Sequence, residues 1–326
     1  MVSIDDSRLL EFCGVHKLDP DVERLLHRFV LAGRPSLHTL TPEQARANTR
    51  ALMDLRGNSV AVGSVENTML PGPAGKIPIR IYRPAGKGPF PLLIYYHGGG
   101  WVLCDLDTHD NTCRIFCALA QCVTVSVDYR LAPEHKFPAA VDDCYAALEY
   151  LAKDAIQMGA DPLRLAVGGD SAGGNLAAVV AQLARDRGGP VLSHQLLLYP
   201  IMDTLSFNTM SYKKFAKGYF LEKAGMEWFC EHYLNDPSDA ADPRTSPLLS
   251  KDLTRLPAAQ IATAGFDPLR DEGAAYARRL KEAGIPVDYI CYGEIIHGFA
   301  GMVGVIPSAK KAMAEIAERL RQALCK

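Results

Sequence analysis

Ser171 lies at the centre of a G-x-S-x-G pattern that runs from Gly169 to Gly173. An apolar, strand-like run at 163–167 precedes the pattern, and a helical run follows from about Asn175. In this context a tight strand-to-helix turn exposes the serine hydroxyl, and only small neighbours permit its strained backbone. The pattern predicts a nucleophilic serine. A phosphate-binding turn is disfavoured because no Lys-Ser or Lys-Thr pair follows.

A serine hydroxyl is a weak nucleophile without a base, and His297 is our candidate among nine histidines. It follows the strand-like run 287–292 and precedes the last helical run. Asp267 follows the strand-like run 260–264 and would orient the imidazole. All three side chains would lie beyond the ends of successive parallel strands, at one edge of a sheet. We therefore predict a Ser171, His297 and Asp267 triad.

Three consecutive glycines, Gly98, Gly99 and Gly100, follow the strand-like run 92–96. Glycines here leave backbone N–H groups uncovered, as a site that stabilises an oxyanion requires. We expect two of these three N–H groups, together with the N–H of Ala172, to form an oxyanion hole. A flexible turn without function is the simpler alternative.

Other polar residues near these motifs have structural interpretations. We expect Asp271, the rival acid, to cap the helix that begins there. We expect Arg130 and Glu134 to form an ion pair, and Asp170 to bond to backbone groups. Cys104 is interpreted either as a buried residue or as a reactive thiol if it is exposed.

His109, Cys113 and Cys117 are spaced at i, i+4 and i+8 and would share one stripe of a helix. Such a stripe could gather metal ligands, but the sequence offers no evident fourth ligand. A core-facing stripe is the better interpretation. We expect no metal and no cofactor.

Strand-like and helical runs alternate from about residue 60, which predicts an α/β fold with a mostly parallel central sheet flanked by helices. Residues 1–56 read as helical, with a helix start at Thr41. Residues 203–245 interrupt the alternation with many aromatic side chains, which indicates a cap. A helix packed on the core without a role in binding is the alternative. The predicted strands lie at 77–82, 92–96, 122–128, 163–167, 195–199, 260–264 and 287–292, and the predicted helices at 19–32, 111–120, 139–154, 175–187, 271–283 and 308–324.

In combination these motifs resemble the hormone-sensitive-lipase-like branch of the α/β-hydrolases, also called bacterial esterase family IV. The resemblance covers about residues 60–320. It implies a helical cap segment at 1–56 and a catalytic domain at 57–326, with 203–245 as a cap insertion. It also implies a carboxylic ester hydrolase for short to medium acyl chains that needs no cofactor. The matching stretches are 97–100, 129–134, 137–140, 169–174, 267–269 and 297–299.

Composition excludes several other classes of protein. The chain has 326 residues, a net charge of −2 and 48% hydrophobic residues, which is typical of a globular protein with a large core. It contains no basic stripe for nucleic acid and no apolar run that could span a membrane. The acidic start lacks the features of a signal peptide, and nine cysteines fit free thiols, so we expect a cytoplasmic protein. A sheet edge could pair with a second copy to give a homodimer.

Two alternatives to an ester hydrolase stay open. The same triad could cleave amides, carbamates or lactones, because all share a tetrahedral intermediate. A small-molecule receptor on a hydrolase scaffold is a second alternative, but such receptors resembling this family have lost the catalytic histidine. Turnover of p-nitrophenyl butyrate would separate a receptor from an enzyme.

Overall fold

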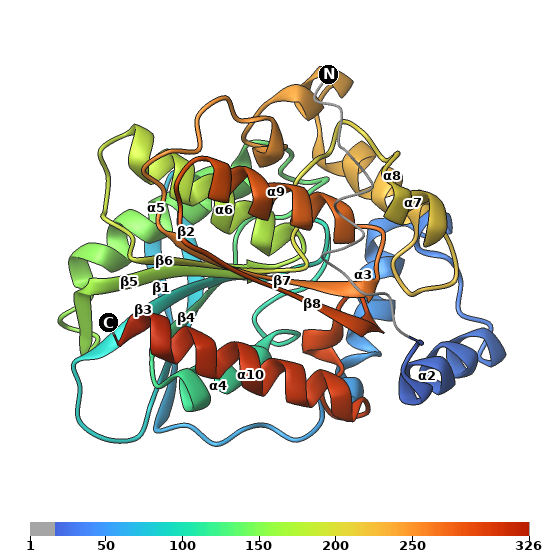
Figure 1. Cartoon of the computed structure of the whole chain (residues 1–326). Coiled ribbons are helices and arrows are strands. Elements are labelled where there is room, and N and C mark those ends of the chain that lie inside the picture. Colours follow the sequence, from blue (N-terminus) through green and yellow to red (C-terminus); the bar gives the residue numbers. More distant parts are fainter. Residues whose placement is uncertain (1–16, 326) are drawn as a thin grey trace.

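One eight-stranded sheet runs through the structure, a computed structural model in which residues 17–325 are described (Figure 1). The strands are β1 (Ser64–Gly72), β2 (Gly75–Arg83), β3 (Phe90–Tyr96), β4 (Val123–Val127), β5 (Ala160–Asp170), β6 (His194–Leu198), β7 (Ala258–Phe266) and β8 (Val287–Ile296). Their order in the sheet is β1-β2-β4-β3-β5-β6-β7-β8. β2 is antiparallel to β1 and β4, and all other neighbours are parallel. The expected mostly parallel α/β sheet is confirmed.

Long helices cover both faces of the sheet. Figure 1 shows α5, α6 and α9 on one face and α4 and α10 on the other. The central strands β3 and β4 are buried along almost their whole length, which explains the apolar run of β3 and the small, β-branched or uncharged residues of β4. The helices are α4 (Asp110–Ala120), α5 (Ala139–Asp154), α6 (Ala172–Asp186), α9 (Arg270–Glu282) and α10 (Pro307–Leu324).

The edge strand β1 was not predicted from the sequence. Its first six residues are all exposed, and Leu70 is the only buried residue of the strand. The strand therefore lacks the alternation of apolar and polar residues that marks a half-buried strand. Its place comes from hydrogen bonding to β2 over the full length from Ser64 to Gly72. Tertiary pairing therefore decides a structure that local sequence does not indicate.

Two segments form what we call the cap, residues 17–56 and 203–245. Thr41 begins α3 with a capping box shared with Gln44, as predicted. Figure 1 shows both segments on the right, beyond the ends of β7 and β8. The cap elements are α2 (Pro20–Leu31), η1 (Leu37–Thr39), α3 (Pro42–Arg50), η2 (Met53–Arg56), α7 (Met210–Lys214), α8 (Lys223–Tyr233) and η3 (Pro237–Ala241). Two short turns, η4 (Pro247–Leu249) and η5 (Phe299–Gly301), lie outside the cap.

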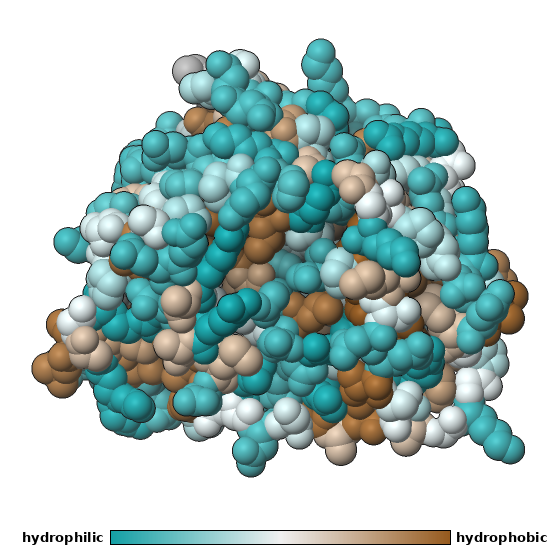
Figure 2. Space-filling view, turned by 180° about the vertical axis from the view of Figure 1, so that it is seen from behind, coloured by the Kyte–Doolittle hydropathy of each residue, from teal (hydrophilic) through white to brown (hydrophobic). Residues whose placement is uncertain are grey.

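The surface seen from behind is mainly hydrophilic, and apolar side chains gather there in small patches and hollows (Figure 2). Within residues 17–325, no helix combines the length and the apolar character needed to cross a membrane. Seven cysteines of this region are free thiols, five of them buried. Cys291 is in a disulfide, so the expectation of free thiols is wrong for this residue.

Candidate active site

Ser171 lies in the sharp turn between β5 and α6. Its backbone has φ of 54° and ψ of −118°, a conformation that costs energy for any residue except glycine. Two glycines make the turn possible. A Cβ atom on Gly173 would collide with the carbonyl oxygen of Tyr96, and one on Gly169 would collide with Gly173. The spacing of the G-x-S-x-G pattern thus follows from close backbone contact beneath the serine.

The three predicted catalytic side chains meet at the carboxyl edge of the sheet. His297 Nε2 lies 3.0 Å from Ser171 Oγ, and His297 Nδ1 lies 2.8 Å from Asp267 Oδ2. The backbone N–H of Leu269 donates to the other oxygen of Asp267 at 2.8 Å. Ser171 is 7% exposed, His297 6% and Asp267 0%. With the proton on Nδ1, the imidazole donates to Asp267 and can accept the proton of the serine hydroxyl.

The glycine loop after β3 lies beside Ser171, but its three N–H groups are not equivalent. Gly98 N donates to Asp170 Oδ1 at 3.1 Å, so this group is not free to bind an oxyanion. Of the three glycines Gly98, Gly99 and Gly100, this contact leaves Gly99 and Gly100 as the two candidates for the predicted oxyanion hole. Gly99 and Gly100 line the same cavity as Ser171 and His297. Ala172 begins α6, where the first N–H groups have no partner within the helix.

The carboxylate of Asp170 accepts hydrogen bonds from several buried groups behind the serine. Its Oδ1 atom accepts the hydroxyl of Tyr95 at 2.8 Å and lies 3.1 Å from His109 Nε2. Burial opposes ionisation of Asp170, but His109 and Tyr95 outweigh this effect and lower the pKa of the carboxyl. A charged Asp170 thus ties Gly98, and with it the glycine loop, to the turn that carries Ser171.

Two structural interpretations of nearby residues are wrong. Asp271 does not cap α9. Its Oδ2 atom accepts the N–H of Ser211 at 2.7 Å and so fixes the start of α7. Arg130 pairs with Asp143 at 2.8 Å and not with Glu134. Asp271 also pairs with its neighbour Arg270 at 2.8 Å, but the contacts with Ser211 and between Arg130 and Asp143 join residues more than ten positions apart, which local spacing does not predict.

The stripe of His109, Cys113 and Cys117 does not face a single environment. His109 faces Asp170, whereas Cys113 and Cys117 are buried in the core between the sheet and α10. In the part of the chain that the structure describes, no group of side chains is arranged to hold a metal ion. Cys104 lines the active-site cavity, but burial raises the pKa of its thiol to about 12. A thiol that stays protonated is a poor nucleophile.

A cavity of about 510 Å³ opens above Ser171 between the cap and the sheet. Its lining is mostly apolar, with a few charged side chains. Phe229 of α8 limits the space beside the glycine loop, since a Cβ on Gly100 would collide with its ring. The apolar lining is Leu26, Phe29, Val30, Pro35, Leu37, Leu40, Leu52, Met53, Leu55, Leu103, Tyr199, Phe220, Leu221, Phe229 and Met302.

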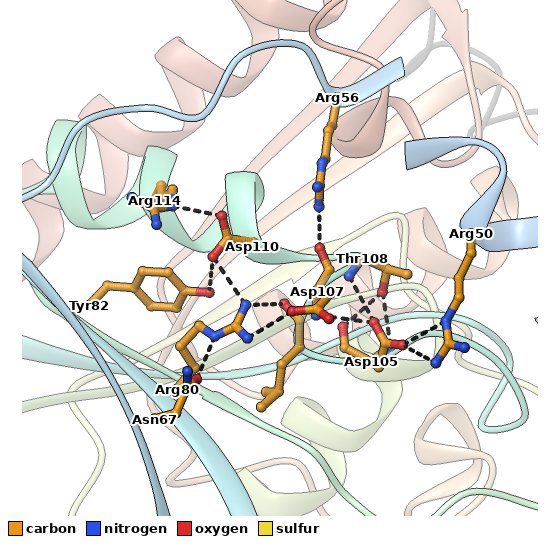
Figure 3. Close-up of polar contacts among 11 residues, drawn as sticks. Arg50, Arg56, Asn67, Arg80, Tyr82, Asp105, Asp107, Thr108, Asp110 and Arg114 are labelled. Carbon is orange, nitrogen blue, oxygen red and sulfur yellow. Dashed lines mark hydrogen bonds and ion pairs between the residues drawn. The ribbon is translucent and has the colours of Figure 1, made fainter. Parts of the chain in front are cut away.

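Arginines of the cap hold the segment that links the glycine loop to α4 (Figure 3). Arg50 of α3 pairs with Asp105 at 2.9 Å, and Arg56 of η2 donates to the carbonyl oxygen of Asp107. On the sheet side, Arg80 of β2 pairs with Asp107 at 2.8 Å and with Asp110 at 3.2 Å. Side chains of the cap and of the sheet therefore both bind the segment that links the glycine loop to α4.

Sequence reasoning missed the partners of Asp170 and these arginine contacts. The position of Asp170 beside the nucleophile was the available signal, because a carboxylate in that buried turn needs partners. Nothing in the local sequence marks Arg50 or Arg56, since each pairs across more than fifty positions.

Comparison with protein families gives a match to the model of an α/β-hydrolase fold over residues 93–301. The carboxylic ester hydrolase LipN of Mycobacterium tuberculosis is 46% identical over 311 residues, which cover 93% of this chain and 82% of the relative. The ethyl acetate hydrolase of Pseudomonas putida is 36% identical over 318 residues, 94% of this chain and 99% of the relative.

Solved structures of ester hydrolases are similar over almost the whole chain. An ester hydrolase from the metagenome of Lake Arreo, solved with a derivative of bipyridine phosphonate, superposes with a TM-score of 0.91 at 45% identity. The match covers 95% of this chain and all of that one. A thermostable esterase from Pseudomonas putida also gives a TM-score of 0.91, at 37% identity, covering 94% of this chain and 98% of that one.

Proposed function

The chain belongs to the hormone-sensitive-lipase-like family of α/β-hydrolases and is a carboxylic ester hydrolase, and we propose that it cleaves short- to medium-chain esters through an acyl-enzyme on Ser171. One observation carries this proposal. The hydrogen bonds from Asp267 through His297 to Ser171 join an acid, a base and a nucleophile in one row. This is the arrangement that transfers a proton away from a serine as it attacks a carbonyl.

In the first half-reaction, Ser171 Oγ bonds to the ester carbonyl carbon while its proton passes to His297 Nε2. Asp267 accepts a hydrogen bond from Nδ1–H and stabilises the imidazolium. The N–H groups of Gly99, Gly100 and Ala172 donate to the tetrahedral oxyanion, and each such donor is worth about 3 kcal/mol in the transition state. The carbon–oxygen bond to the alcohol then breaks, and His297 returns the proton to that oxygen.

In the second half-reaction, a water molecule takes the place of the alcohol. His297 Nε2 accepts a proton from this water as its oxygen attacks the acyl carbon. The second tetrahedral intermediate uses the same three N–H donors. Its collapse breaks the bond to Ser171 Oγ, which recovers the proton and releases the carboxylic acid.

We expect Ser171→Ala to lower kcat by about 10⁶, because the nucleophile is lost while the fold is retained. The test is the hydrolysis of p-nitrophenyl esters from C2 to C12 by the wild type and the variant. The wild type should prefer the shorter half of this series, since cap residues line the cavity of about 510 Å³ above Ser171 and limit the room for a long acyl chain.

A phosphonate that reacts with serine should add mass at Ser171 in the folded wild type. Hydrolysis by Ser171→Ala at close to the wild-type rate would contradict the assignment of the nucleophile. A wild type that prefers C12 would contradict only the proposed chain length.

A further inference from the structure

Arg34 lies on the wall of the active-site cavity, in the turn between α2 and η1. Its Nη1 atom is buried and has no hydrogen-bond partner, and its Nη2 atom reaches only the carbonyl oxygen of Asn48 at 3.5 Å. The guanidinium carbon lies 4.7 Å from the ring centre of Phe29. An arginine stacked on an aromatic ring presents a fixed plane of donors.

Other arginines of the cap are paired. Arg46 contacts Glu134 and Arg50 contacts Asp105, at 2.7 Å and 2.9 Å respectively. Arg34 has no such partner among residues 17–325, and burial alone accounts for the lowered pKa of its guanidinium. Arg34 is half-buried, and a buried donor without a partner, such as its Nη1 atom, is unfavourable, so the cavity gains by binding an anion there.

The other charges around the cavity leave an excess of positive charge. Arg56 lines the cavity, as does the exposed Lys217 from the other half of the cap. Asp170 also borders it, but this carboxylate already accepts buried donors. Glu222 accepts the N–H of Gly218 at 3.1 Å. The cavity therefore combines apolar walls with cations from both halves of the cap.

We propose that Arg34 binds an anionic group of the substrate, a carboxylate or a phosphate carried at the end remote from the scissile ester bond. This inference rests on the proposed function and names a class of ester for it. The planar guanidinium can donate two parallel hydrogen bonds to either anion, and the apolar walls accommodate the chain between the anion and the ester. Anionic amphiphilic esters are therefore the class of substrate that fits this cavity.

The test compares p-nitrophenyl esters of equal acyl length that end in a methyl group, a carboxylate or a phosphonate. The measured quantity is the ratio of kcat/KM for each anionic ester to that for the methyl-ended ester. We expect Arg34→Gln to lower this ratio about tenfold to a hundredfold, mainly through KM, because a hydrogen bond to a charged group is lost. Arg34→Lys should keep part of the preference.

Arg28→Gln is the matched control, since Arg28 is exposed on α2, the helix that precedes the turn with Arg34, and does not line the cavity. Its ratio should equal that of the wild type.

A parallel series carries the charge on the alcohol, as butyrate esters of alcohols that end in a methyl group, a carboxylate or a phosphonate. A loss confined to the carboxylate or to the phosphonate esters identifies the anion that Arg34 binds.

An unchanged ratio for Arg34→Gln in both series would overturn this proposal and leave the proposed function standing. That result would mean that Arg34 only fixes the turn through Asn48, and all esters would then be affected equally. A wild type that hydrolyses none of the methyl-ended esters would overturn the proposed function itself, and this proposal with it.

Discussion

Ser171 is held in a strained backbone conformation by close backbone contacts that leave no room for a side chain on Gly169 or Gly173. The cost of this strain is offset by the packing of the last six residues of β5 and the first turns of α6, which are buried. The hydroxyl of Ser171, our proposed nucleophile, is therefore held at a fixed point, 3.0 Å from Nε2 of His297, the proposed base. Asp170 directly precedes Ser171 and accepts a hydrogen bond from the N–H of Gly98. This bond also fixes the glycine loop relative to Ser171.

We expect Asp170→Asn to lower kcat about 10- to 100-fold with little change in KM. The neutral amide cannot keep all of the contacts to Gly98, Tyr95 and His109, so the glycine loop would shift relative to Ser171. Loss of a direct oxyanion donor costs about 10²–10³, and a displaced loop should cost less. Steady-state kinetics with p-nitrophenyl butyrate measure the effect.

Asp161→Asn is the control for this variant, since Asp161 lies at the opposite end of β5 and pairs with Arg164 at the surface. It should leave kcat unchanged. If Asp170→Asn raised KM with kcat intact, Asp170 would act on substrate binding and not on the oxyanion loop.

Helix α3 is fastened to the catalytic domain mainly through Arg46. Its guanidinium donates to the carbonyl oxygens of Val102 and Ala132, each at 2.9 Å, and to both carboxylate oxygens of Glu134. Val102 belongs to the loop that follows the glycines. One side chain of the cap thus supports the backbone next to the oxyanion site.

We expect Arg46→Lys to loosen α3, because a lysine ammonium cannot reach three acceptors with the geometry of the guanidinium fork. Amide hydrogens of residues 42–50 should exchange faster, and the free energy of unfolding should fall by about 1–3 kcal/mol. Hydrogen exchange followed by mass spectrometry measures the first effect, and urea unfolding measures the second.

Arg50→Lys in the same helix serves as the comparison. Arg50 makes one exposed ion pair with Asp105, and such pairs contribute at most about 1 kcal/mol. Equal exchange in the two variants would show that the carbonyl contacts of Arg46 do not hold the helix.

At the scale of the whole molecule, the buried residues His97 and His194 link stability to pH. Burial lowers the pKa of both His97 and His194 to about 4. The unfolded chain binds a proton at each of these residues near pH 6.5, whereas the folded protein does so only near pH 4. Stability is therefore fully present above pH 6.5 and is lost as the pH falls towards 4, on the order of 3 kcal/mol for each histidine.

Urea unfolding between pH 4.5 and 7 measures this contribution as the difference in slope of unfolding free energy against pH between the wild type and a variant without the histidine. We expect His194→Gln to reduce the slope by the equivalent of about one proton. His27→Gln, at an exposed position of α2, should leave the slope unchanged. The same slope in His194→Gln and the wild type would contradict the assignment.

Much of the fold could be predicted from local sequence. The buried parallel strands have continuous apolar runs, and the helices between them have apolar faces, because burial on both faces or on one face dictates those patterns. Strand β1 escaped prediction because it is exposed and paired on one side only. The capping box at Thr41 was predictable because all of its contacts lie within one turn.

The sequence by itself determined which residue types are available for chemistry, since Ser171, Asp267 and His297 each stand at the end of a recognisable strand. Only the tertiary structure decided which groups pair. It commits the N–H of Gly98 to Asp170 and, among residues 17–325, leaves Nη1 of Arg34 without a hydrogen-bond partner. The physical reason is the separation along the sequence of the residues that interact. Strand and helix patterns reflect neighbours a few positions away, whereas ion pairs and buried donors depend on residues that the folded chain brings together from distant positions.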